Sequence, residues 1–273
     1  MTVAVPESVS GSPVILSALV VAHNEEHQLA DCLAPLRFAD EIVVVLDRCT
    51  DRSQAIATAL ADQVIEGAWE IEGDRRNTGI AACRGQWIVE VDADERLDPP
   101  LAREIRSVIA TSVHAIHDIP VDNYIGARLV RHGWGASYGT TACPRVCRKG
   151  TKVWGRERVH PALVFHGTRG PRLQNPLRHY VDRDISDMIH RLDRYASARA
   201  RDLRDKRQRN EGRRETFATN LRRLFSRFFK CYVLRKGYRE GGYGFLIALF
   251  AGLYPLLSYL KATLEDGTDR HGR

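Results

Sequence analysis

An acidic cluster follows a run of strand-forming residues in the stretch IVEVDADERLDPPL, residues 88–101. Asp92 and Asp94 are two positions apart, so on an extended backbone their carboxylates would point to the same side. Hard oxygen donors in this arrangement suit Mg²⁺ or Mn²⁺ bridging to the phosphates of a bound nucleotide. Short D-x-D motifs also occur in solvated loops, so the surrounding elements must decide between the two interpretations.

The first hundred residues alternate between apolar strand patterns and amphipathic helix patterns. Strands are predicted at 13–22, 42–46, 63–67 and 86–91, and a helical pattern follows each of them. Strands that are apolar throughout and alternate with helices form a mostly parallel sheet covered on both faces. The predicted fold is therefore α/β, with a Rossmann-like, mostly parallel sheet and helices on both faces.

Polar residues end three of these strands, and parallel strands bring their carboxyl ends to one edge of the sheet, where ligands bind. These residues are His23, Asn24 and Glu25, then Asp47 and Arg48, and then Asp92 and Asp94. The chain lacks G-x-G-x-x-G after the first strand and lacks a P-loop motif, which disfavours dinucleotide oxidoreductases and P-loop enzymes. The pattern favours a nucleotide diphosphate site with a metal ion at Asp94.

An ordered set of motifs carries a resemblance to a known family. These are LSALVVAHNEE, ADEIVVVLDRCTDRS, RRNTGIAACRGQWIVEVDADERL, HGW and RVH. In this order they resemble the family 2 glycosyltransferases of the GT-A fold, and within them the lipopolysaccharide core biosynthesis subgroup. The similarity runs from about residue 14 to the C-terminal hydrophobic segment.

The resemblance implies a set of nucleotide-binding residues. They are Asn24 and Glu25 at the base, Asp47 at the uracil or ribose, Arg76 and Asn77 on the nucleotide, and Asp92 near the ribose or metal. The family normally has small residues after the aspartate of the second strand. Arg48 and Cys49 stand there in this chain, which leaves the base preference open.

The resemblance also implies metal, catalytic and acceptor residues. Asp94 would be the direct metal ligand, with Asp92 beside it and His160 completing the shell of Mg²⁺ or Mn²⁺; a structural role is the alternative for this histidine. The subgroup usually has glutamate after this histidine, where Pro161 stands here. The candidate bases are Glu157, three residues before His160, and Asp122. Trp134 and Arg145 are the candidates for contact with sugar or acceptor, with packing and solvation as the alternatives.

The implied reaction is attack by an acceptor hydroxyl on the anomeric carbon of a nucleotide sugar. The nucleoside diphosphate leaves with inversion, and a carboxylate takes the proton of the acceptor. The subgroup implies a lipid-linked or lipopolysaccharide-type acceptor.

The last third of the chain is basic and partly apolar. Residues 194–240 contain 16 Lys and Arg against 5 Asp and Glu, whereas the whole chain has a net charge of +7. On a helix, one stripe carries Phe217, Leu221, Leu224, Phe225, Phe228 and Tyr232, and the other side carries Arg222, Arg223, Ser226, Arg227 and Lys230. This pattern is typical of a helix at an anionic membrane surface. Residues 241–260 carry no charge and would cover about 30 Å as a helix, enough for a bilayer span, with a soluble core helix as the alternative.

These patterns predict the organisation and location of the chain. We expect a flexible N-terminus at 1–13 and a catalytic domain at 14–183, with a nucleotide-sugar half at 14–98 and an acceptor half at 99–183. A helical membrane-associating region at 184–264 and a tail at 265–273 follow. The first thirteen residues lack the basic start and apolar core of a secretory signal. The expected location is the cytoplasmic face of the inner membrane, through peripheral association or one C-terminal segment.

Two other function classes compete with a glycosyltransferase. An arginine-rich protein could bind RNA or a membrane without catalysis, but no nucleic-acid-binding module is visible and lipid explains the aromatic stripe better. We therefore expect no nucleic-acid partner. A nucleotidyltransferase would be favoured by a glycine-rich basic loop after the first strand, where this chain has the acidic HNEE.

Overall fold

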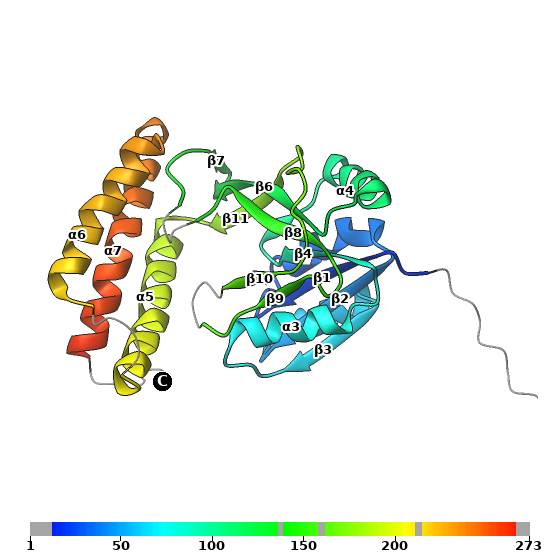
Figure 1. Cartoon of the computed structure of the whole chain (residues 1–273), viewed down its shortest axis with the longest axis horizontal. Coiled ribbons are helices and arrows are strands. Elements are labelled where there is room, and N and C mark those ends of the chain that lie inside the picture. The colour runs from blue at the N-terminus through cyan, green and yellow to red at the C-terminus, as the bar shows by residue number, and fades with distance from the viewer. Residues whose placement is uncertain (1–12, 136–138, 158–161, 211–214, 266–273) are drawn as a thin grey trace, which may run out of the picture.

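The computed structural model describes residues 13–135, 139–157, 162–210 and 215–265. One sheet runs through the catalytic part (Figure 1), in the order β3-β2-β1-β4-β8-β6-β11-β5, with β7 paired to β6. Its first four strands are parallel neighbours: β1 (Leu16–Ala22), β2 (Glu41–Asp47), β3 (Gln63–Gly67) and β4 (Trp87–Asp92). All residues of β1 and β2 are buried, which explains why their sequences are apolar on both faces.

The second half of the sheet mixes directions. β8 (Ala142–Arg148) is antiparallel to β4 and to β6 (Ile116–Ile125), whereas β11 (Leu177–Asp182) is parallel to β6. β11 also pairs with the two-residue strand β5 (Glu95–Arg96), which places His179 opposite Glu95. The remaining strands are β7 (Arg128–Val130) and a separate hairpin of β9 (Lys152–Trp154) and β10 (Leu163–Phe165).

Helices cover both faces of the parallel half, as predicted. On one face lie α1 (Leu29–Leu33), the 3₁₀ turn η1 (Ala34–Phe38), α2 (Ser53–Leu60) and α4 (Pro99–Thr111). On the other face α3 (Glu72–Ala82) packs Ile80 against Leu19, Val43 and Val45. The structure therefore confirms the α/β fold with a mostly parallel, Rossmann-like sheet.

The last third of the chain forms a helical unit beside the sheet (Figure 1). It consists of α5 (Ile185–Gln208), α6 (Phe217–Phe229), the π turn η2 (Lys230–Leu234), the 3₁₀ turn η3 (Gly237–Glu240) and α7 (Gly242–Leu264). α7 packs against both α5 and α6, and its Ile247, Ala248 and Ala251 are fully buried with Met188 and Ala196 of α5.

The apolar helix α7 has the length and composition of a membrane span, but half of its most hydropathic window is buried inside the protein. Gly252 allows a close approach to α6, because a Cβ there would lie 2.6 Å from the carbonyl oxygen of Leu224. In this arrangement α7 is the central helix of the unit, which favours the predicted alternative of a core helix.

The predicted stripe of α6 is divided between two environments. Leu224, Phe228 and Tyr232 are partly buried, and the rings of Phe228 and Tyr232 lie in the cluster around α7. Phe217, Leu221 and Phe225 are exposed. The helix therefore uses only one edge of its stripe for internal packing.

Candidate active site

Two cavities meet at the carboxyl edge of the sheet, and both are also lined by α5. The first, of about 640 Å³, contains Asp47, Arg48, Arg75, Arg76, Asp92, Arg145, His179 and Arg194 among its lining residues. The second, of about 1060 Å³, contains Asn24, Glu25, Asp94, Arg96, Asp182, Arg191 and Arg194. The side chains of Asp94 and His179 touch where the cavities meet, and Arg194 lines both.

Asp92 and Asp94 point to different cavities, so the expectation that they share one side is wrong. Strand β4 ends at Asp92, and residues 93 and 94 form a turn before β5. The turn breaks the two-residue alternation of an extended chain. Asp92 therefore lines the first cavity and Asp94 the second.

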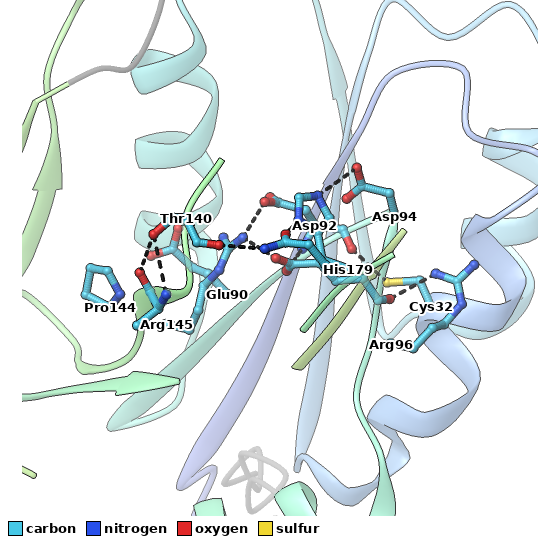
Figure 2. Close-up of polar contacts among 12 residues, drawn as sticks. Cys32, Glu90, Asp92, Asp94, Arg96, Thr140, Pro144, Arg145 and His179 are labelled. Carbon is cyan, nitrogen blue, oxygen red and sulfur yellow. Dashed lines mark hydrogen bonds and ion pairs between the residues drawn. The ribbon is translucent and has the colours of Figure 1, made fainter. Parts of the chain in front are cut away.

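Two arginines hold the carboxylate of Asp92. Arg76 Nη2 lies 2.8 Å from its Oδ1, and Arg145 Nη2 contacts its Oδ2 (Figure 2). Burial disfavours charge on Asp92, but Arg145 and Arg76 hold its pKa well below the usual range. Arg76 and Arg145, predicted on the nucleotide and on the sugar or acceptor, are thus ion-pair partners of Asp92, and Asp92 is not free to be a metal ligand in this arrangement.

Glu95 is the buried support of this cluster. Its side chain is 1% exposed, its Oε1 lies 2.6 Å from Arg145 Nη2, and its Oε2 accepts a hydrogen bond of 2.8 Å from the backbone N–H of Asp92. Burial raises its pKa to about 7. Glu95 therefore fixes both the end of β4 and the position of Arg145.

His179 is a site residue that the sequence did not reveal. Its Nε2 lies 3.3 Å from Asp94 Oδ2, and its Nδ1 lies 2.9 Å from Oδ1 of Asn123, whose amide donates to Thr140 O at 2.7 Å. Burial opposes the charged imidazole, but the carboxylate of Asp94 raises the pKa of His179 to about 9. The pairing of β11 with β5 and β6 brings His179 to Asp94, and no local pattern in LRHYVD signals this contact.

Asp94 and His179 fit a divalent cation as two of its ligands. Nε2 of His179 and Oδ2 of Asp94 lie 3.3 Å apart, so both side chains could contact one ion. Carboxylate and imidazole are both ligands of first-row divalent metals. Within the described ranges no group of three His, Cys, Asp or Glu side chains could hold a metal, so phosphates and water would complete the shell. The predicted ligand His160 lies outside the described residues.

The carboxylate of Asp47 forms ion pairs with two neighbouring arginines. Arg48 donates to it at 2.9 and 3.0 Å, Arg75 at 3.2 Å, and the backbone N–H of Trp69 at 3.1 Å. Burial works against its charge, but the hydrogen bonds from Arg48 and Trp69 hold its pKa below the usual range. Arg48, which replaces a small residue of the family motif, has φ of 50° and also donates to Trp69 O at 2.6 Å.

Asn24 and Glu25 shape the turn after β1. Asn24 has φ of 56°, and its Oδ1 accepts from the backbone N–H of Thr50 at 2.8 Å. The backbone N–H of Glu25 donates to Ser53 Oγ at 2.9 Å. Burial and the nearby Asp94 raise the pKa of the Glu25 carboxyl to about 7. Both residues line the second cavity, away from Asp47.

The two predicted bases lie outside both cavities. Asp122 is on the face of β6 opposite to Asn123, because side chains alternate along a strand. Glu157 is exposed and lines a separate cavity with residues of α5. Its Oε2 accepts from the backbone N–H of Ala162 at 2.9 Å, and such hydrogen bonds lower its pKa. The structure therefore does not support either residue as the base.

Two further predicted site residues are structural. Asn77 donates to Trp154 O at 2.9 Å and accepts from Trp154 N at 3.0 Å, so it secures β9 to α3 and does not line either cavity. Trp134 is buried among Met188, Leu192 and Ile247 and donates through Nε1 to Val130 O at 2.6 Å. The structure favours the packing alternative for Trp134, which joins the sheet to the helical unit.

The edge of this sheet thus combines acidic strand ends, arginines and two adjoining cavities. A family-wide sequence model described as glycosyl transferase family 2 matches residues 17–152. The chain is a family 2 glycosyltransferase.

The similarity of this glycosyltransferase to its relatives covers most of the sequence. It is 25% identical over 259 residues to the lipopolysaccharide core biosynthesis glycosyltransferase LpsC of Rhizobium meliloti (strain 1021), which covers 90% of this chain and 91% of LpsC. An uncharacterized glycosyltransferase of Rickettsia bellii (strain RML369-C) is 22% identical over 275 residues, with 92% and 87% covered. The resemblance predicted from the motifs is confirmed.

Two solved structures show limited similarity to this glycosyltransferase. S. aureus TarS, residues 1–349, has a TM-score of 0.45 and 13% identity, with 89% of this chain and 81% of TarS covered. Glucosyl-3-phosphoglycerate synthase from Mycobacterium tuberculosis, in complex with Mn²⁺, uridine diphosphate and glucosyl-3-phosphoglycerate, has a TM-score of 0.34 and 22% identity, with 41% and 44% covered.

Proposed function

We propose that this glycosyltransferase moves a sugar, with inversion, from a nucleotide diphosphate sugar to a lipid-linked or lipopolysaccharide-type glycan. The observation that carries the proposal is the contact between Asp94 and His179 where two cavities meet. A donor and an acceptor need separate spaces that join at the reacting carbon, and the two cavities provide such spaces. The relative LpsC, by its name a lipopolysaccharide core enzyme, supports the class of acceptor.

A divalent ion, Mg²⁺ or Mn²⁺, belongs to this proposal. Asp94 and His179 would hold it, and when bound it would supply positive charge against the leaving diphosphate. His179 must lose its proton to bind a metal, so its raised pKa predicts that metal binds more tightly as the pH rises toward 9.

Arginines of the chain complete the electrostatics of the proposed reaction. Arg194 is exposed and lines both cavities, so its guanidinium can contact the diphosphate as it leaves. Arg76 and Arg145 are neutralised by Asp92 and Glu95 and hold the strand end in place. The nucleotide would thus lie in the first cavity, in the pocket around Asp47, with its diphosphate toward Asp94.

We further propose that the enzyme works at the cytoplasmic face of the inner membrane. A lipid-linked acceptor is confined to the bilayer surface, and the basic helical unit adjoins the second cavity through α5.

The test is a donor screen followed by turnover of two site variants. Uridine, guanosine and thymidine diphosphate sugars are added with and without Mn²⁺, and a ligand of the native state raises the unfolding temperature. We expect one nucleotide to stabilise the protein only with metal. With that donor, Asp94→Ala and His179→Ala should lower hydrolysis or transfer by about 100-fold or more, as for the loss of a group that stabilises developing charge.

The matched control is Asp62→Asn. Asp62 lies just before β3, at the opposite end of the strands from the site, and caps the backbone N–H of Ile42 at 2.7 Å. Its activity should remain near that of the wild type. Full turnover by Asp94→Ala, with unchanged metal dependence, would refute the proposed site.

A further inference from the structure

The outer side of α6 and η2 carries a row of exposed apolar side chains. Leu221, Phe225, Phe229 and Val233 recur every four residues and are 36%, 65%, 54% and 41% exposed, and Leu234 is 65% exposed. Residues four apart lie above one another on a helix. We call the surface formed by Leu221, Phe225, Phe229, Val233 and Leu234 the apolar ridge.

The apolar ridge does not result from poor packing of α6, because the inner side of the same helix is well covered. Phe228 stacks on Tyr232 with ring centroids 5.4 Å apart and meets Phe245 edge-on at 5.7 Å. Asn220 and Cys231 are fully buried. The helix thus has enough apolar side chains to pack on α7 and keeps a second set facing outward, which is uncommon for a soluble surface.

The charge of this segment has one sign. Residues 217–239 contain seven Lys and Arg and no Asp or Glu. Arg222 and Lys230 are exposed next to the apolar ridge, and Lys236 and Arg239 follow it in the chain. A surface with this charge attracts an anionic partner and repels a copy of itself.

We propose that the apolar ridge is a docking surface for an anionic lipid bilayer. In this arrangement α6 lies flat in the headgroup region with Phe225 and Phe229 inserted, while Arg222 and Lys230 contact lipid phosphates. A helix that binds an anionic bilayer surface carries aromatic and aliphatic side chains on one face and cations on the other. α7 stays inside the protein as the support of α6, so the attachment is peripheral.

The choice of a bilayer over other partners follows from the combination of features. A symmetric dimer through the ridge would bring the exposed Arg222 and Lys230 of one chain toward the same residues of the other, and these like charges repel. Single-stranded nucleic acid stacks on separate aromatic platforms along a charged groove, whereas the ridge is a convex helix surface. This docking proposal depends on the proposed function in one respect, which is that the acceptor lies in the membrane.

The experiment measures sedimentation of the full chain with vesicles of phosphatidylcholine, with and without phosphatidylglycerol. We expect binding to the anionic vesicles that weakens with salt, because screening reduces the attraction. The double variant Phe225→Ser/Phe229→Ser should lower the fraction bound by about tenfold or more, since each ring loses its apolar contact. Arg222→Gln/Lys230→Gln should lower binding to anionic vesicles only.

A matched control removes an exposed apolar side chain elsewhere. Val113, which is 86% exposed between α4 and β6, is replaced in Val113→Ser, and vesicle binding should be unchanged. Wild-type binding by Phe225→Ser/Phe229→Ser would overturn the proposal. So would a wild-type dimer that this variant converts to a monomer, or binding to RNA in place of vesicles. Retention of the protein in membranes washed with alkaline carbonate would show a spanning segment and overturn the peripheral arrangement.

Hydrolysis of the nucleotide sugar separates this inference from the proposed function. None of the ridge residues lines either cavity, so the double variant should retain hydrolysis in solution. If the wild type bound vesicles but hydrolysed no nucleotide sugar, the proposed function would fail and the docking surface would stand. The reverse result would leave the transferase and refute the docking surface.

Discussion

The catalytic sheet and the helical unit use charged and apolar side chains in opposite ways. At the sheet edge, Arg145 is 7% exposed in its side chain and contacts two carboxylates. On α6, Arg222 is exposed, and the aromatic residue Phe225 of the same helix is 65% exposed. One region has charges inside and the other has aromatic rings outside.

The difference teaches what each region is adapted to. Buried charges cost free energy unless they are paired, so the cluster of Asp92, Glu95, Arg76 and Arg145 marks a place where a fixed electrostatic environment is needed. Exposed aromatic rings need no partner within the folded protein. Their cost is relieved only when a partner covers them, which is why the helical unit points to an external surface.

Removing one buried cation should have the largest effect on stability. Arg145→Leu leaves Asp92 with only Arg76 and leaves Glu95 without its guanidinium, so unfolding should require about 3–5 kcal/mol less free energy. The same change on the helical unit, Arg222→Leu, should alter stability by less than about 0.5 kcal/mol. Urea unfolding of both variants measures the difference, and equal effects would contradict the contrast between the two regions.

The second effect tests whether α7 is a packed core helix. Gly252→Ala places a Cβ against the backbone of Leu224 and should lower stability by about 1–3 kcal/mol, even though alanine favours the helix. Gly242→Ala is the matched control, because no atom lies within 4 Å of a Cβ there. It should be neutral or slightly stabilising. Thermal unfolding without detergent measures both variants. Equal unfolding temperatures would contradict the assignment of α7 as a packed core helix.

The smallest effect concerns the pH dependence of the sheet edge. The pKa of Glu25 is about 7 in the folded protein against an ordinary 4.5, so the folded state binds the proton more tightly. The stability that this proton provides is complete below about pH 4.5 and is lost as the pH rises through 7. Glu25→Gln imitates the protonated carboxyl. The difference between 4.5 and 7 corresponds to about 3 kcal/mol before solvent screening of this half-buried carboxyl, so the variant should be at least about 1 kcal/mol more stable than the wild type at pH 8, but nearly equal to it at pH 4.

Denaturant titrations in the presence of a chelator measure this pH dependence without a cation at Asp94. Glu26→Gln is the opposite control, because hydrogen bonds from Arg52 lower the pKa of Glu26. Removing the negative charge of Glu26 should not stabilise the protein at high pH. If the Glu25→Gln variant had the same stability as the wild type from pH 4 to 8, the pKa of Glu25 would not be raised in the folded protein.

Much of the fold could be predicted from the sequence because its signals are local. Continuous apolar runs such as IVVVL, residues 42–46, indicate buried parallel strands, and polar residues at their carboxyl ends mark the edge where a ligand binds. The division of the α6 stripe could not be predicted, since Leu224 and Phe225 are equally apolar. Only the position of α7 decides which of them is covered.

The site was predicted at its strand ends and missed where it depends on pairing. Asp94 and its place at the edge follow from β4, but His179 is 85 residues away and reaches Asp94 through the pairing of β11 with β5. The role of Glu95 could not be predicted from the sequence, because its partner Arg145 comes from β8. The prediction of Glu157 as the base depends on its spacing from His160, and spacing along a loop does not determine where a side chain points.

The position of α7 between α6 and α5 has a consequence for the length of the acceptor. Neighbouring helix axes lie about 8–10 Å apart. If a bilayer docks on α6 as proposed, two such steps would separate it from the cavity wall on α5 by about 20 Å. A glycolipid would have to extend several sugar rings above its headgroup before its end entered the second cavity. We expect the helical unit to select acceptors by length, admitting an already elongated core and excluding a bare lipid.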